Sequence, residues 1–137
     1  MNFDDEVNYR PGLYGAQERN PYPMERGYFY ANPHVAGMAA EDNAVVMNPY
    51  TQLTEPEQNA VRMNESARIN MRQQGYPDFE LTPEQSAYLD TTEYRNAPYN
   101  ERSATIAARE LSGDPTAGIT TEQQKTFVKL LRQRMGM

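Results

Sequence analysis

The stretch LTPEQ at residues 81–85 predicts where a helix begins. A threonine that precedes a helix accepts a hydrogen bond from the backbone N–H three residues later, and a glutamine at that later position returns one to the threonine N–H. Thr82 and Gln85 have this spacing. Pro83 suits the first helical position, where a backbone N–H has no partner within the helix. The stretch therefore predicts a helix from Pro83 to about Asp90.

Two other stretches repeat this pattern. One is LTEPEQ, where Thr54 is followed by Glu57, and the other is ITTEQ, where Thr120 is followed by Gln123. A true internal repeat and a helix-start signal used three times both account for the similarity. The three stretches are unequally spaced, which favours the helix-start signal.

Four helices are expected in residues 51–137, which we interpret as a small helical domain. The spacing of apolar residues predicts helices over about 55–74, 83–90, 98–112 and 121–135. The residues expected to face inward are Ala60, Val61, Met63, Ala67, Ile69 and Met71 in the first helix, Ala87, Tyr88 and Leu89 in the second, Ala104, Ala107, Ala108 and Leu111 in the third, and Phe127, Val128, Leu130, Leu131 and Met135 in the last.

Residues 1–50 have a different composition. They hold six of the ten tyrosines, five of the ten prolines and no lysine. Proline fixes its own φ and moves the preceding residue toward extended geometry. We therefore predict a long extended, turn-rich arm with one helical turn near residues 36–42, while YFY (28–30) and AVVM (44–47) are candidate short strands. The predicted fold class is mainly α, a small bundle of about four short helices preceded by this arm.

The aromatic side chains suggest that the arm binds something. Disordered segments are poor in aromatic residues, and tyrosine offers a large contact area with a polar tip. Two interpretations are open: the arm becomes ordered along a partner surface, or it folds back on its own C-terminal domain. Arginine suits bidentate contacts at interfaces. The candidate partner-binding residues are Tyr14, Tyr22, Tyr28, Phe29, Tyr30, Tyr50, Arg10, Arg19 and Arg26.

Composition excludes several functional classes. Of the 137 residues, 38% are hydrophobic, below the share of about 45–50% in globular chains, so the core is expected to be modest. The net charge of −6 argues against a dedicated nucleic-acid-binding protein. The absence of cysteine excludes disulfides and thiolate metal sites. The sequence lacks a long apolar run and an apolar leader, so a soluble protein inside a cell is expected.

No pattern of catalytic residues is present. His34 is the single histidine, so a metal cluster of several histidines is excluded. A catalytic triad that uses a second histidine is excluded as well. Glu41 and Asp42 are adjacent carboxylates without the spacing of a calcium loop, and we interpret them as a solvated acidic pair. No phosphate-binding loop, dinucleotide fingerprint or nucleophile elbow occurs. We therefore predict no catalytic residue, no cofactor and no metal, with an enzyme as the third and weakest hypothesis.

The last predicted helix is basic. It holds both lysines of the chain, Lys125 and Lys129, together with Arg132 and Arg134. Basic residues near the C-terminal end of a helix complement the helix dipole, which is the simpler interpretation. The other interpretation is that they dock on an acidic partner surface.

Three features together resemble a known class of proteins. They are the Asn-Pro-Tyr-rich arm, the entry NPYTQL into a capped helix, and the stretch TIAARELSGDPTAG. In these features the chain resembles small accessory structural proteins of tailed bacteriophage virions. Such proteins act by binding, either cementing capsid shells or sitting at a portal, connector or tail.

The resemblance implies a virion protein that is assembled in the host cytoplasm in multiple copies. Its partners would be capsid, portal or tail subunits, with no small-molecule substrate, membrane or direct contact with nucleic acid. The predicted function is a non-enzymatic structural and interaction protein that docks by its helical module and its arm. The alternative is a small helical adaptor or inhibitor that binds one host or viral protein.

Overall fold

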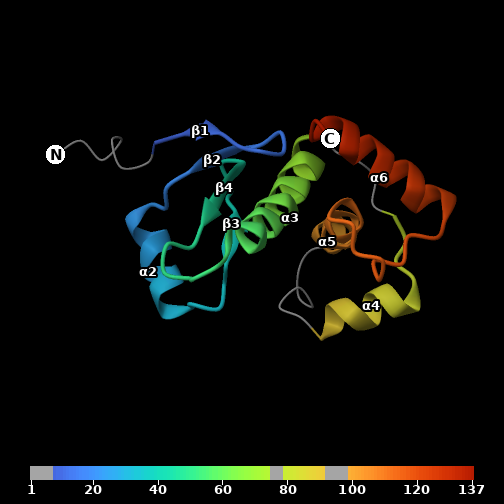
Figure 1. The fold of residues 1–137 in the computed structure, drawn as a ribbon, viewed down its shortest axis with the longest axis horizontal. Coiled ribbons are helices and arrows are strands. Elements are labelled where there is room, and N and C mark those ends of the chain that lie inside the picture. Colours follow the sequence, from blue (N-terminus) through green and yellow to red (C-terminus); the bar gives the residue numbers. More distant parts are fainter. Residues whose placement is uncertain (1–7, 75–78, 92–98) are drawn as a thin grey trace.

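The computed structural model describes residues 8–74, 79–91 and 99–137. These residues form five helices and four strands. The helices are α2 (Pro23–Ala31), α3 (Glu55–Gln74), α4 (Pro83–Asp90), α5 (Tyr99–Leu111) and α6 (Glu122–Arg134), and the strands are β1 (Arg10–Pro11), β2 (Gln17–Arg19), β3 (Gly37–Ala39) and β4 (Ala44–Met47). The sheet and α2 lie on one side of α3, and α4, α5 and α6 lie on the other (Figure 1).

The predicted fold class is wrong, because residues 8–50 are not an extended arm. They fold as a four-stranded mixed sheet with the strand order β1-β2-β4-β3 and one helix. Strands β2 and β4 are parallel, and the outer pairs are antiparallel. The AVVM stretch does form a strand, but YFY lies in α2, and the turn expected near residues 36–42 is instead β3 with the hairpin turn after it.

The sheet is stable because β4 is covered on both faces. Val45 packs with Ala16 and with Ile69 of α3, whereas Val46 packs with Phe29 of α2. Successive side chains of a strand point to opposite faces, so two adjacent valines serve two separate clusters. Residues 8–50 therefore fold back on the rest of the chain, which was one of the two interpretations of the arm.

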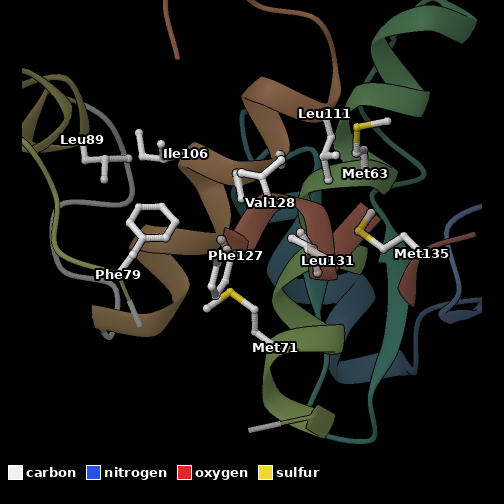
Figure 2. Packing of buried hydrophobic residues seen from close by; sticks show 14 residues of the cluster. Met63, Met71, Phe79, Leu89, Ile106, Leu111, Phe127, Val128, Leu131 and Met135 are labelled. Atoms are coloured by element: carbon white, nitrogen blue, oxygen red, sulfur yellow. The ribbon is translucent and has the colours of Figure 1, made fainter. Parts of the chain in front are cut away.

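The larger core lies between α3, α5 and α6, with α4 at its edge (Figure 2). The rings of Phe79 and Phe127 meet edge to face with centroids 4.9 Å apart. The predicted inward residues of α5 are all buried, as are those of α6 except Leu130, which is exposed. In α4 only Leu89 of the three predicted residues is buried, because this short helix contacts the core along one narrow side. In α3, Ala60 is exposed and Val61 half-buried, while the other four predicted residues are buried.

Two of the three predicted helix starts are confirmed. The Thr54 N–H donates to Glu57 and the Glu57 N–H to the Thr54 hydroxyl, and Thr82 and Gln85 exchange the same two bonds. The third start is displaced by one residue, because Thr121 rather than Thr120 caps α6 and accepts from the N–H of Gln124. The tertiary structure explains this displacement, because the side chain of Gln124 is buried in the protein interior.

Gln85 and Gln124 form a buried amide pair that joins the beginnings of α4 and α6. Each side-chain amide donates to the carbonyl oxygen of the other, at 3.2 and 2.9 Å. Gln85 also donates to the backbone oxygens of Ala117 and Gly118, and Gln124 donates to that of Glu80. The cap at Thr82 therefore also supplies Gln85 to the polar contact that holds these helices together, and its partner Gln124 follows directly after the stretch ITTEQ.

The turn between β1 and β2 is expected to be sensitive to one substitution. Gly15 has φ +78°, and a Cβ there would lie 2.9 Å from the backbone oxygen of Arg134 at the end of α6. We expect Gly15→Ala to lower the free energy of unfolding by about 2 kcal/mol, from left-handed strain and the forced shift of α6. Urea denaturation measures this. Gly27→Ala is the control, because a Cβ at Gly27 meets nothing within 4 Å, and an unchanged Gly15→Ala protein would contradict the prediction.

Candidate interaction site

A buried arginine organises the surface of the sheet next to α2. Arg19 ends β2, and 2% of its side chain is exposed. Its guanidinium donates to both oxygens of Glu25, at 2.6 and 2.9 Å, and to both oxygens of Asp42, at 2.8 and 3.1 Å. A fifth bond goes to the backbone oxygen of Asn20, so all five N–H donors are used.

Two tyrosines complete this cluster. The guanidinium carbon of Arg19 lies 3.9 Å from the centre of the Tyr22 ring. The hydroxyl of Tyr9 donates to Asp42 at 2.7 Å and lies 2.8 Å from the hydroxyl of Tyr22. We call Tyr9, Arg19, Tyr22, Glu25 and Asp42 the Arg19 cluster. It joins the segment before β1, the end of β2, the start of α2 and the β3–β4 turn.

The charges in the Arg19 cluster stabilise one another. Burial opposes ionisation of Glu25 and Asp42, but their hydrogen bonds to Arg19 outweigh it and lower the pKa of both carboxyls. The same bonds raise the pKa of Arg19 despite its burial. The hydrogen bonds to Tyr22 and then to Asp42 raise the pKa of Tyr9. Both carboxylates are therefore bound to the same guanidinium, which ties the start of α2 and the β3–β4 turn to the end of β2.

A second ionic cluster attaches the sheet to α3. Glu18 is buried and accepts from Arg10 at 3.1 Å and from Arg62 of α3 at 2.9 Å. Arg72 of α3 donates to the backbone oxygens of Ala39 and Ala40. These contacts fix the β3–β4 turn, and thereby Asp42, relative to α3.

An open pocket of about 480 Å³ lies beside the Arg19 cluster. Residues of β2, the start of α2 and the β3–β4 turn line it. They are Arg19, Tyr22, Glu25, Met38, Ala39, Ala40, Glu41 and Asp42. Three carboxylates and one arginine give the lining an acidic balance, and Met38, Ala39 and Ala40 are its apolar part.

The outer side of α2 is apolar and exposed. Phe29 is its only buried residue, with no exposed surface, whereas Met24 is 89%, Tyr30 74% and Tyr28 49% exposed. The ring of Tyr30 meets that of Tyr50 edge to face at 5.4 Å, and Tyr50 is also exposed. We call Met24, Tyr28, Tyr30 and Tyr50 the α2 surface.

The structure separates the predicted partner-binding residues into three groups. Exposed residues are Tyr22, Tyr28, Tyr30 and Tyr50. Half-buried residues are Arg10, Tyr14 and Arg26, of which Tyr14 packs against the larger core and Arg10 pairs with Glu18. Fully interior residues are Phe29 and Arg19. Phe29 packs with Val46, and Arg19 pairs with Glu25 and Asp42, so both side chains make their contacts within the protein itself.

Sequence reasoning missed Tyr9, Met24, Glu25 and Asp42. Asp42 was interpreted as solvated, but it accepts two bonds from a buried arginine. One local signal was available: Glu25 stands three residues after Tyr22 and accepts its N–H, as in a helix-start pair. The pairing of Arg19 with Asp42 joins residues far apart in the sequence and has no local signal.

Comparisons with protein-family models, with curated proteins and with solved structures found no match to this chain. In the described residues, no three or more histidine, aspartate or glutamate side chains gather as a metal site. No helix in the described part of the chain is long and apolar enough to cross a membrane.

Proposed function

We propose that this protein is a non-enzymatic structural and interaction protein that docks on another protein through the α2 surface. The observation that carries the proposal is the exposure of α2. A surface helix normally buries an apolar stripe, but α2 buries a single side chain and leaves Met24, Tyr28 and Tyr30 in solvent. Clustered exposed apolar residues mark interaction sites, and tyrosine is enriched among the residues that dominate binding energy.

The rigidity of the α2 surface supports this function. Phe29 anchors α2 to β4, and Glu25 at its first turn is held by Arg19. A surface that is already ordered loses less conformational entropy on binding than an extended arm. The docking element is therefore a folded helix with flanking tyrosines, in place of the extended arm that the sequence predicted.

We place this docking protein in a tailed-phage particle, with capsid, portal or tail subunits as partners. The basis is the resemblance of NPYTQL and TIAARELSGDPTAG to accessory virion proteins. In such a particle the same surface is offered in many copies, and the resulting avidity permits modest affinity for each contact.

Incorporation into particles tests the proposal. We expect the triple variant Met24→Gln, Tyr28→Gln, Tyr30→Gln to lose at least about tenfold in particle-bound protein, because the anchors are removed while Phe29 is retained. Particles are purified on a density gradient, and the protein is quantified by mass spectrometry. Leu13→Gln is the control, because Leu13 is 63% exposed but lies in the β1–β2 turn. Unchanged incorporation of the triple variant into particles would contradict the proposal.

The second candidate function is an adaptor or inhibitor of one host or viral protein. The observation that favours it is that residues 8–50 fold on the chain's own α3, which makes the protein a self-contained module. Stoichiometry distinguishes the two functions. Many copies per particle support the structural protein, and a one-to-one complex outside particles supports the adaptor.

A further inference from the structure

We propose that copies of this chain associate head to tail, with the basic side of α6 in one copy against the acidic pocket of the next. The basic side consists of Lys125, Lys129 and Arg132. This inference concerns surfaces other than the α2 surface and does not depend on the proposed function.

The basic side of α6 is a single stripe. Lys125, Lys129 and Arg132 follow the spacing i, i+4, i+7, and all three are exposed. Lys129 lies on the side of α6 opposite the buried Phe127 and Leu131, and Lys125 and Arg132 lie next to it along the helix. In the described part of the chain, the side chains of Lys129 and Arg132 contact no carboxylate, and Lys125 has only a 3.4 Å contact with the exposed Glu122.

The helix dipole explains only one of the three residues of this stripe. A cation is favourable in the last turn of a helix, which accounts for Arg132 and Arg134. Lys125 lies in the first turn, where the dipole disfavours a positive charge, and Lys129 lies in the middle. Like charges four residues apart also repel one another. A partner that supplies negative charge would offset both effects.

The acidic pocket supplies the complementary charge. Arg19, the arginine in its lining, donates to Glu25 and Asp42 of the protein itself. The carboxylate of Glu41, in the β3–β4 turn, makes no hydrogen bond or ion pair with any described residue and is exposed. The apolar part of the lining, Met38, Ala39 and Ala40, suits the methylene stem of a lysine, whose ammonium would then reach Glu41.

The placement of the two surfaces makes the second copy a fitting occupant. The pocket belongs to the sheet side of α3, and α6 lies on the other side, so the two are separated within one chain (Figure 1). Two different patches that pair between copies form a heterologous interface, which builds rings or filaments rather than closed two-fold dimers. Such an arrangement gives an acidic protein a specific self-contact through the basic helix α6.

Sedimentation velocity on the purified full chain tests the inference. We expect self-association at about 20 mM ionic strength that weakens at about 300 mM, where the screening length falls to about 6 Å. Lys129→Glu and Glu41→Lys should each weaken self-association by about tenfold or more, because attraction is replaced by repulsion. An equimolar mixture of the two variants should associate again, because each provides the surface that the other has lost.

Two controls make the result specific. Glu80→Lys changes the net charge as Glu41→Lys does, on an exposed residue outside the pocket, and should leave self-association intact. Circular dichroism should show unchanged melting for all variants, since the altered side chains are exposed. A monomeric wild type at low salt would overturn the inference. A mixture of Lys129→Glu and Glu41→Lys that fails to associate would also overturn it. The same holds if the basic side of α6 binds a duplex oligonucleotide while the protein stays monomeric.

Discussion

Arg19→Met is expected to lower the free energy of unfolding by about 3–4 kcal/mol at neutral pH. Removing one partner of a buried ionic network leaves the others without compensation, which typically costs about 3–5 kcal/mol. The carboxylates of Glu25 and Asp42 keep 19% and 32% of their side chains exposed, so water relieves part of that cost. Methionine retains the apolar stem of the side chain. Urea denaturation followed by circular dichroism gives the difference.

The same variant has a distinctive pH dependence. The folded-state pKa values of Glu25 and Asp42 lie below their unfolded values, because both carboxyls are bound to Arg19. Their contribution to stability is therefore present above about pH 4–4.5, the unfolded range, and is lost as pH falls through the folded values. The gap between wild type and Arg19→Met should accordingly narrow as the pH is lowered from about 6 toward 3.

Arg10→Met is the matched control for this prediction. Arg10 is also an arginine in the sheet, but 41% of its side chain is exposed, and its partner Glu18 keeps a second bond to Arg62. Exposed ion pairs contribute about 0–1 kcal/mol, so Arg10→Met should cost no more than that. Equal losses of unfolding free energy for Arg19→Met and Arg10→Met would contradict the role given to the Arg19 cluster. So would a stability difference between wild type and Arg19→Met that does not change with pH.

Gln124→Leu is expected to cost about 3 kcal/mol of stability although leucine is more hydrophobic and nearly as large. The substitution removes the partner of Gln85 and leaves the backbone oxygen of Glu80 without its donor. A buried polar group left unpaired costs about 1–3 kcal/mol, and at least two such groups are affected. Thermal unfolding measures the loss.

The control for Gln124→Leu lies on the same helix. Gln133 is exposed, so Gln133→Leu makes the same chemical change without breaking a buried bond and should shift stability by at most about 0.5 kcal/mol. Amide hydrogen exchange adds a second readout: loss of the pair should speed exchange first at the beginnings of α4 and α6. Wild-type stability of Gln124→Leu would show that the buried pair contributes little.

The helices in residues 51–137 were predictable because the signals for them are local. The helix over residues 55–74 was predicted with the bounds of α3, and the caps at Thr54 and Thr82 were read from three-residue spacings. The choice between Thr120 and Thr121 was not local. Both precede α6, and the burial of Gln124 against Gln85 decides which one caps the helix.

The sheet was not predictable in the same way. Its strands contain two to four residues, too few for an alternating pattern to stand out, and its central pair joins β2 to β4 across α2 and β3. Prolines and tyrosines in residues 1–50 indicate extended backbone, which a strand and an arm share. A strand differs from an arm only in that it pairs with a neighbouring strand, and the local sequence does not show which segment that neighbour is.

The features of the candidate site also fall into those that local sequence determines and those that tertiary contacts decide. The sequence by itself determined the helix starts at Thr54 and Thr82, the apolar faces of α5 and α6, the basic stripe on α6 and the supply of tyrosines near α2, because each depends on residues within a few positions of one another. Only the tertiary structure decided that Arg19 and Phe29 are interior, that Asp42 is paired and that Glu41 is exposed. Burial and ion pairing join residues distant in the chain, and these contacts exist only once the chain has folded.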